Sequence, residues 1–271
     1  MADKADIRPA EKISLQAGWT VHKGQVRQNN EDSAAAVDVV LADGDEQQSV
    51  GVYAVADGMG GREGGEVASS LAVHTTVQRI VEAITTSAEP EPDDFRDWLR
   101  DAVEAADRTV QDEGGEMGTT LLAAIIVEQR AYLAHVGDSR AYILTGSGME
   151  QLTEDQNYVQ ALLKAGAIEP HQVENHPYRN VLRQAVGKAD DLEIELYETD
   201  LHPQDTLMLC TDGLTRELDD AAIERIVRQS ESPQEACDAL VAAANARGGR
   251  DNISVILVRI QPRQDGESSH A

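Results

Sequence analysis

Apolar residues occur along the chain in two kinds of pattern, short strand-like runs and longer stretches with helical spacing. The run 119–127 is apolar on both faces, which is typical of a strand buried between two layers. The stretch 94–112 repeats apolar residues every three or four positions, among them Phe95 and Leu99, and a glycine pair follows where the helix should stop. Further helices are expected near 63–83, 219–229 and 233–246. Strands are expected near 14–22, 34–41, 49–57, 119–128, 131–137, 139–145, 192–200, 205–212 and 252–260.

The order of these elements predicts an α+β fold. Strands come in groups that are separated by two helical stretches, and they do not alternate regularly with single helices as in βαβ units. Two packed, mostly antiparallel sheets with a layer of helices on each outer side would account for this order. We therefore expect a four-layer αββα sandwich.

Between residues 151 and 190 the strand pattern lapses. Thr153 and Gln156 have the spacing of a capping box at a helix N-terminus, and Gly166 follows as a C-cap, so we predict a helix that begins near Thr153. We expect this segment to form a flap beside the sheet edge. The whole stretch 12–262 is expected to be one domain.

The regions outside this domain, residues 1–11 and 263–271, are polar and are expected to be flexible tails. The chain contains no run of about 18 apolar residues, and its first residues lack the apolar segment of a signal peptide. We therefore expect a cytoplasmic protein.

The net charge of −26 excludes some partners, because such a field repels nucleic acid and anionic membrane surfaces. Two explanations of the acidity stay open. It is either an adaptation to a salty cytosol, where dense carboxylates keep the surface hydrated, or the composition of an ordinary acidic bacterial protein.

Five aspartates each stand at one end of an apolar, strand-like run. Asp57, Asp138 and Asp212 close such runs, whereas Asp32 and Asp251 precede them. Because the end of one antiparallel strand lies beside the start of its neighbour, all five carboxylates can collect at one edge. They would repel one another unless they are protonated or neutralised by a cation. All-oxygen sites suit Mg²⁺ or Mn²⁺, so the pattern predicts a metalloenzyme.

Residues around these aspartates suggest further chemistry. Arg27 stands just before Glu31 and Asp32, where its guanidinium can hold a phosphate group by two contacts, although a surface ion pair in a turn explains it equally well. Gly58 follows Asp57 in a glycine-rich turn, which can bring a carbonyl oxygen to a metal ion, although the turn can also be a hairpin corner. No single motif decides between these alternatives.

The order of the motifs does decide. The set closely resembles the metal-dependent (type 2C, or PPM) serine/threonine protein phosphatases in their bacterial form, over about residues 12–262. The resemblance implies the αββα sandwich of that family, in agreement with the layers predicted above. The motifs that carry it are Arg-x-x-x-Glu-Asp-Ser (27–33), Asp-Gly-Met-Gly-Gly (57–61), Gly-Thr-Thr (118–120), Gly-Asp-Ser-Arg (137–140), Asp-Gly (212–213) and Asp-Asn (251–252).

The resemblance also implies a role for each site residue. Two core Mn²⁺ or Mg²⁺ ions would be bound by four aspartates and one backbone carbonyl, a further glutamate would act mainly through water, and an arginine would grip the substrate phosphate. One more aspartate would help to hold a weaker third ion. The core ions would be bound by Asp32, Asp57, Asp212, Asp251 and the carbonyl of Gly58. Glu31 would act through water, and Arg27 would grip the phosphate. Asp138 and Asp212 would hold the third ion.

Met59 departs from the pattern of the eukaryotic members, which have at this position a histidine that is proposed as the general acid. Bacterial relatives share the replacement. The leaving oxygen must then receive its proton from another group, and a water on the third ion is the preferred donor. His135 and His176 are the alternatives.

The implied reaction is direct hydrolysis of phosphoserine and phosphothreonine in proteins by a metal-bridging hydroxide, without a phosphoenzyme. We expect phosphorylated proteins as partners, with a cognate serine/threonine kinase and its substrates among them, and a monomer. Three alternatives stay open: a catalytically silent phosphatase-like sensor, a phosphatase for another phosphomonoester, and an acidic Ca²⁺-binding protein. The last leaves Arg27 and the glycine-rich turns unexplained.

Overall fold

The structure is a computed structural model that describes residues 13–43, 46–60, 64–173, 176–188 and 191–263. The predicted tails 1–11 and 263–271 therefore lie outside the described residues, apart from Arg263. Residue 63, where the first helix was predicted to begin, lies outside them as well.

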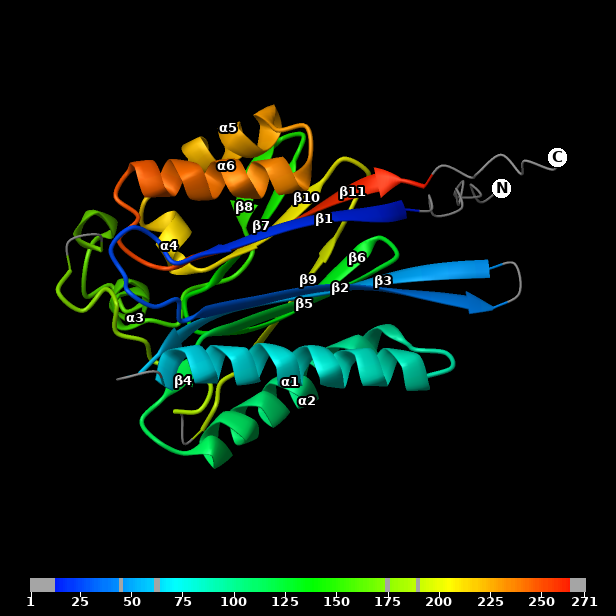
Figure 1. Cartoon of the computed structure of the whole chain (residues 1–271), viewed down its shortest axis with the longest axis horizontal. Helices are drawn as coiled ribbons and strands as arrows, with labels where there is room; N and C mark the ends of the chain where they lie inside the picture. Colours follow the sequence, from blue (N-terminus) through cyan, green and yellow to red (C-terminus); the bar gives the residue numbers. More distant parts are fainter. Residues whose placement is uncertain (1–12, 44–45, 61–63, 174–175, 189–190, 264–271) are drawn as a thin grey trace, which may run out of the picture.

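Two β-sheets pack face to face in the middle of the molecule (Figure 1). All pairings between the described strands are antiparallel. The first sheet has the order β1 (Ile13–His22), β11 (Ile253–Pro262), β10 (Thr206–Cys210), β7 (Arg140–Thr145) and β8 (Gly148–Gln151). The second has the order β2 (Asp32–Asp43), β3 (Glu46–Met59), β5 (Leu121–Val127), β6 (Arg130–Val136) and β9 (Glu195–Asp200), with β4 (Gly118–Thr119) paired to β3.

Helices cover the outer face of each sheet (Figure 1). The helices α1 (Gly64–Thr86) and α2 (Pro92–Glu113) lie on the second sheet, and α5 (Asp220–Gln229) and α6 (Pro233–Ala246) lie on the first. This arrangement is the predicted αββα sandwich. Three short elements complete the described part of the chain: α3 (Tyr158–Lys164), a 3₁₀ turn (Pro170–Gln172) and α4 (Asp212–Thr215).

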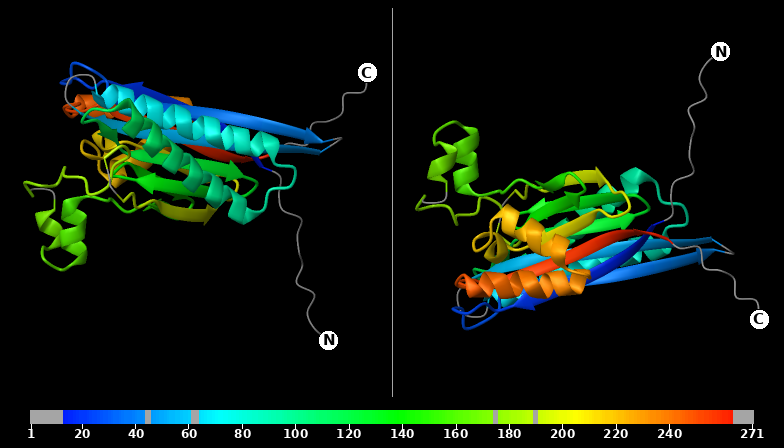
Figure 2. Two further views of the ribbon diagram at one scale, coloured as in Figure 1. Left: turned by 90° about the horizontal axis from the view of Figure 1, so that it is seen from below. Right: turned by 90° about the horizontal axis from the view of Figure 1, so that it is seen from above.

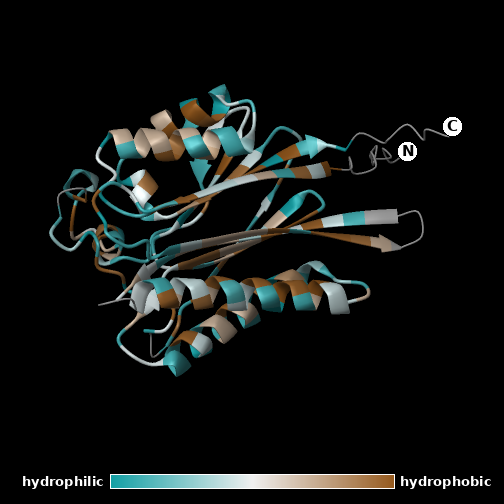
Figure 3. Ribbon diagram, in the orientation of Figure 1, coloured by the Kyte–Doolittle hydropathy of each residue, from teal (hydrophilic) through white to brown (hydrophobic). Residues whose placement is uncertain are grey.

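Alternation along the strands builds three hydrophobic cores, one between the sheets and one beneath each pair of helices. In β10, Leu207 and Leu209 pack between the sheets, whereas Met208 and Cys210 pack against the layer of α5 and α6. This is the two-residue periodicity of a strand that is buried on both faces. Figure 3 shows the hydrophobic residues along the strands and on the helices beside them.

The segment between β8 and β9 projects from the sandwich and carries α3, as the predicted flap should (Figure 2). The prediction that its helix begins near Thr153 is wrong. Thr153 is buried, and its Oγ1 accepts a hydrogen bond from the backbone N–H of Ala141 at 3.0 Å, so the sheet uses this hydroxyl. Asn157 caps α3 instead, because its Oδ1 accepts from the N–H of Gln160 at 2.9 Å. Gly166, with φ of +66°, follows the end of the helix as predicted.

The strand predicted over 205–212 is shorter than expected and ends at Cys210. The chain turns at Thr211, and Asp212 begins the short helix α4. Arg216 follows one helical turn later and therefore lies on the same side as Asp212. This turn brings a cation to the edge where the aspartates gather.

Candidate metal centre

The structure brings the five predicted aspartates to one edge of the two sheets. Asp32 starts β2 directly opposite Asp57, near the end of β3. The other three stand on the β6–β7 turn, on α4 and just before β11. We call the set Asp32, Asp57, Asp138, Asp212 and Asp251 the carboxylate edge. A cavity of about 650 Å³ opens over it, lined by four of these aspartates and by Arg27, Glu31, Gly58 and Met59, among others. Asp32 is buried beneath.

Asp32 is held by two buried hydroxyl groups. Its Oδ2 accepts hydrogen bonds from Thr211 Oγ1 and Ser254 Oγ, both at 2.8 Å. Its Oδ1 is buried and has no hydrogen-bond partner among the described residues. Burial raises the pKa of Asp32 to about 7, although the two hydroxyl hydrogen bonds oppose this shift.

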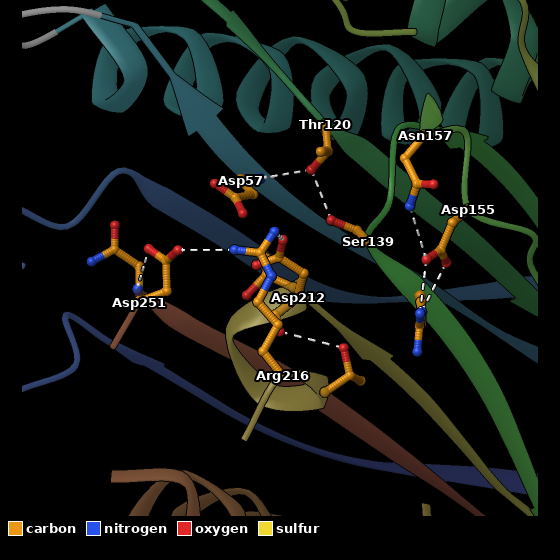
Figure 4. A network of polar contacts seen from close by, with 12 residues as sticks. Asp57, Thr120, Ser139, Asp155, Asn157, Asp212, Arg216 and Asp251 are labelled. Atoms are coloured by element: carbon orange, nitrogen blue, oxygen red, sulfur yellow. Dashed lines mark hydrogen bonds and ion pairs between the residues drawn. The ribbon is translucent and has the colours of Figure 1, made fainter. Parts of the chain in front are cut away.

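Asp57 is positioned through its backbone. Its N–H donates to Thr120 Oγ1 at 2.8 Å, and the hydroxyls of Thr120 and Ser139 share a hydrogen bond of 2.7 Å (Figure 4). These contacts fix the end of β3 against β5 and leave the carboxylate at the cavity. Burial raises the pKa of Asp57 well above its usual range, and the charges of Asp32 and Asp212 add to this effect.

Asp212 and Asp138 have raised pKa values for the same reasons. Burial and then the charge of Asp138 raise the pKa of Asp212, while Arg216 opposes the shift. The pKa of Asp138 is raised to about 6 by burial and then by the charge of Asp155. Asp212 Oδ1 is buried without a hydrogen-bond partner among the described residues, as Asp32 Oδ1 is.

One residue, Asn252, ties the loop before β2 to the carboxylate edge. Its Oδ1 accepts from the N–H of Glu31 at 2.8 Å, and its Nδ2 donates to the carbonyls of Lys23 and Asn29, both at 2.9 Å. The N–H of Gly58 in turn donates to the carbonyl of Glu31 at 3.0 Å. The loop therefore presents Glu31 to the cavity beside Gly58.

The glycines after Asp57 and Asp212 are required by close backbone contacts. A Cβ at Gly58 would lie 2.0 Å from the carbonyl oxygen of Gly65, and one at Gly213 would lie 1.9 Å from that of Asn252. Both distances are far shorter than a van der Waals contact. The two Asp-Gly pairs thus allow the strand ends to pack closely behind the carboxylates.

Two arginines reach the carboxylate edge. Arg27 is half exposed, and its Nη2 donates to Asp251 Oδ2 at 2.9 Å. Arg216 forms an ion pair with Asp212 Oδ2 through Nη2, and its Nη1 lies 3.3 Å from Asp251 Oδ2 (Figure 4). Among the described residues, no three acidic, histidine or cysteine side chains form a preformed metal cage. Two of the carboxylates that could build one are paired with Arg216.

Comparison with known proteins identifies the family. The family profile described as protein phosphatase 2C matches residues 23–245. The chain belongs to this family. The resemblance stated from the sequence motifs is thereby confirmed.

Relatives of this phosphatase cover almost all of its length. The serine/threonine phosphatase stp of Listeria innocua is 35% identical over 262 residues, which are 94% of this chain and all of that protein. A structure of the S. agalactiae serine/threonine phosphatase is 31% identical with a TM-score of 0.79, and covers 91% of this chain and 99% of the other.

The catalytic domain of the phosphatase PstP was solved in complex with two manganese ions. It is 28% identical to this chain with a TM-score of 0.75, and the match covers 92% of this chain and 99% of that domain. The predictions of the αββα fold, of a metal-dependent serine/threonine protein phosphatase and of Mn²⁺ or Mg²⁺ as cofactor are confirmed.

Sequence reasoning missed several residues of the phosphatase site. Thr211 and Ser254, which hold Asp32, stand beside predicted residues but carry no signal of their own. Arg216 follows Asp212 by four positions, a spacing that predicts contact only once α4 is known. The flap residues Asn180, Arg183 and Lys188 also line the cavity, and nothing in their polar sequence predicts this.

The two histidines considered as proton donors do not line the phosphatase cavity. His135 is fully buried in β6, with its ring centroid 6.4 Å from that of Tyr197. His176 lies in the flap, with its ring centroid 6.4 Å from that of Tyr158. Neither lines the cavity over the carboxylate edge, whereas Met59 does.

Proposed function

We propose that this chain hydrolyses phosphoserine and phosphothreonine of proteins in the cavity over the carboxylate edge, by direct attack of hydroxide on phosphorus. The observation that carries this proposal is the convergence of four aspartates and Arg27 around one cavity, with Asp32 buried beneath it, in a protein phosphatase 2C fold. Direct attack needs no cysteine or serine nucleophile. The two cysteines are buried in the core between the first sheet and its helices, and neither lines the cavity.

The donor atoms of the carboxylate edge suit two hard divalent ions. Asp32 Oδ1 and Asp212 Oδ1 are buried oxygens without a hydrogen-bond partner among the described residues, and such atoms are stabilised by a bound cation. We assign Asp32, Asp57, Asp212, Asp251 and the Gly58 carbonyl to the two core ions. We assign Glu31 to an adjacent water, and Asp138 with Asp212 to a weaker third ion.

When bound, Mn²⁺ or Mg²⁺ supplies a water that is deprotonated near neutral pH and positive charge for the phosphoryl oxygens. The residues of the chain contribute position and charge. Thr211 and Ser254 fix Asp32, and Asn252 fixes the loop of Glu31. Arg27 faces the cavity with a guanidinium that can bind two phosphate oxygens. Met59 has no proton to donate, so water in the cavity protonates the leaving oxygen.

We also propose that this phosphatase removes the phosphate groups which a cognate serine/threonine kinase adds to its substrates. We further propose that the protein is a monomer and lies in the cytoplasm. Phosphorylated proteins are the substrates that the family implies. No helix in the described part of the chain is long and apolar enough to span a membrane. The net charge of −26 disfavours nucleic acid and anionic lipid as partners.

Phosphate release from a phosphothreonine peptide tests the proposed function. The peptide should lose phosphate with Mn²⁺, and EDTA should stop the reaction. A catalytically silent sensor would release no phosphate under either condition. An enzyme for another phosphomonoester would cleave a small aryl phosphate but leave the peptide intact.

A further inference from the structure

Arg216 places a positive charge among the aspartates of the carboxylate edge. Arg140 also acts on Asp138, but its Nε and Nη2 both donate to Asp155. Arg216 stands one helical turn after Asp212 and pairs with Oδ2 of both Asp212 and Asp251. Its side chain is 34% exposed, whereas those of Asp212 and Asp251 are 10% and 18% exposed. The ion pairs are thus partly shielded from water. Charges in such a partly buried place interact more strongly than charges at a fully exposed surface.

The effect of Arg216 extends over several acidic groups. Its charge works against burial and against neighbouring acids at both Asp212 and Asp138. Arg27 also reaches Asp251, but it lies on the loop before β2 and is half exposed. Arg216 therefore neutralises the side of the carboxylate edge that contains Asp138, Asp212 and Asp251.

The same oxygens are those that the proposed function assigns to metal ions. A carboxylate oxygen that accepts from a guanidinium has less negative charge to offer to a divalent ion, and the guanidinium itself repels the ion. Arg216 has space to withdraw, because it lines both the cavity over the carboxylate edge and an adjoining cavity of about 700 Å³. The second cavity is lined by the acidic residues Glu217 and Asp219 and by the basic residues Arg247 and Arg250.

We propose that Arg216 is a built-in competitor of the metal ions for Asp212 and Asp251, and that it thereby raises the Mn²⁺ concentration which this phosphatase needs. The inference rests on the proposed function, since it requires these aspartates to be metal ligands. The weak third ion, between Asp138 and Asp212, is affected most. Without metal, Arg216 holds the carboxylate edge together. With metal, it yields its oxygens to the ions.

Calorimetric titration of the EDTA-stripped full chain with MnCl₂ tests this inference through binding alone. In Arg216→Gln, the Mn²⁺ concentration that half-saturates the weakest binding step should fall about tenfold, the effect of losing one partly buried charge pair. The thermal midpoint of the EDTA-treated variant should fall by about 2–4 °C, while that of the Mn²⁺-saturated variant should not fall.

Arg247→Gln is the matched control. Arg247 lines the adjoining cavity, carries the same charge, and its Nη1 donates to a backbone carbonyl, that of Glu217, at 3.0 Å. This variant should bind Mn²⁺ as the wild type does. If Arg216→Gln fails to fold without metal, Arg216→Lys keeps the charge but not the forked pair of donors, and its half-saturating Mn²⁺ concentration should lie below that of the wild type.

The inference is overturned if Arg216→Gln binds Mn²⁺ as the control does, or more weakly. Weaker binding would mean that Arg216 supports the metal site rather than competing for it. Failure of the metal assignment looks different, because wild type, control and variant would then all show no saturable Mn²⁺ binding. Failure of the proposed activity is read separately, as the absence of phosphate release from the phosphothreonine peptide.

Discussion

Asp32 and Asp212 each keep one buried oxygen unpaired among the described residues, while neighbours hold the other. An unsatisfied buried polar atom costs about 1–3 kcal/mol, and more when it is charged. Raised pKa values at Asp32, Asp57, Asp138 and Asp212 express the same cost, because burial favours the protonated form. A divalent cation removes both costs at once.

These pKa shifts predict an unusual pH dependence of stability for the protein in EDTA. A carboxyl group whose pKa is raised by folding binds more protons in the folded chain than in the unfolded chain. In the unfolded chain the pKa of an aspartate is about 3.9. The contribution of these carboxyl groups therefore falls as pH rises from about 4 through the folded values of about 6 for Asp138 and about 7 for Asp32. The thermal midpoint in EDTA should drop over this window, measured by differential scanning calorimetry.

Two comparisons make this pH prediction specific. Mn²⁺-saturated protein should lose the drop, because the ions displace the protons and bind more tightly as pH rises. Asp32→Asn should reduce the drop between about pH 5 and 7 in EDTA, since it removes the group that titrates near about 7. A midpoint in EDTA that rises across this window would contradict the account.

At the scale of elements, the strands follow closely from the sequence. The run 49–57 becomes β3 (Glu46–Met59), and the run 252–260 becomes β11 (Ile253–Pro262), because a short run that is apolar on both faces is buried as a strand between two layers. The predicted start of α3 is wrong because the hydroxyl of Thr153, which could cap a helix, instead accepts a hydrogen bond from the N–H of Ala141 in the neighbouring strand. A tertiary contact of this kind has no local signature.

Gly58 lies near the end of β3, beside the carboxylate edge, and its replacement should disturb both the packing of β3 and the binding of metal. In Gly58→Ala, the Cβ meets the Gly65 carbonyl, so β3 and α1 must separate. We expect a loss of about 1–3 kcal/mol in the free energy of unfolding, measured by urea denaturation, together with weaker Mn²⁺ binding. Gly146→Ala is the control, because nothing lies within 4 Å of its Cβ position. Equal stability of the two variants would contradict the prediction.

The flap brings Arg183 to the cavity, and this predicts a role in holding protein substrates. Arg183→Gln should raise KM for a phosphopeptide about tenfold, the loss of one charge-assisted contact, but change KM for a small aryl phosphate less. Lys164→Gln is the control in the same segment, because Lys164 pairs with Glu154 and lines neither cavity. Equal changes with both substrates would place Arg183 in phosphate binding rather than in peptide binding.

At the scale of the whole molecule, the net charge of −26 should make stability depend on salt. Raising NaCl from about 0.01 M to about 1 M shortens the Debye length from about 30 Å to about 3 Å and screens repulsion between carboxylates. The thermal midpoint should therefore rise, and a fall would contradict this prediction. The salt optimum of activity separates the two explanations of the acidity. A protein adapted to a salty cytosol is most active at high salt, and an ordinary acidic protein at low salt.

The site is only partly visible from the sequence. The five aspartates can be predicted because strand ends in antiparallel sheets must meet, and the motif order assigns them to a family. Arg216, Thr211 and Ser254 act through contacts that require the packed edge, and Arg183 reaches the cavity through a flap without periodic pattern. Residues fixed by strand geometry could be foreseen, whereas those fixed by side-chain packing could not.

The central claim is that the carboxylate edge is the centre of a metal-dependent protein phosphatase, and Asp57→Asn tests it most directly. This variant keeps the shape of the side chain but removes a charge at the cavity. Mn²⁺-dependent phosphate release from a phosphothreonine peptide should fall at least about 100-fold, while the circular dichroism spectrum stays that of the wild type.

Asp101→Asn removes the same charge from an exposed position on α2 and should leave the rate unchanged. We expect a large loss in Asp57→Asn and none in Asp101→Asn. Turnover in Asp57→Asn at the rate of the wild type would contradict it.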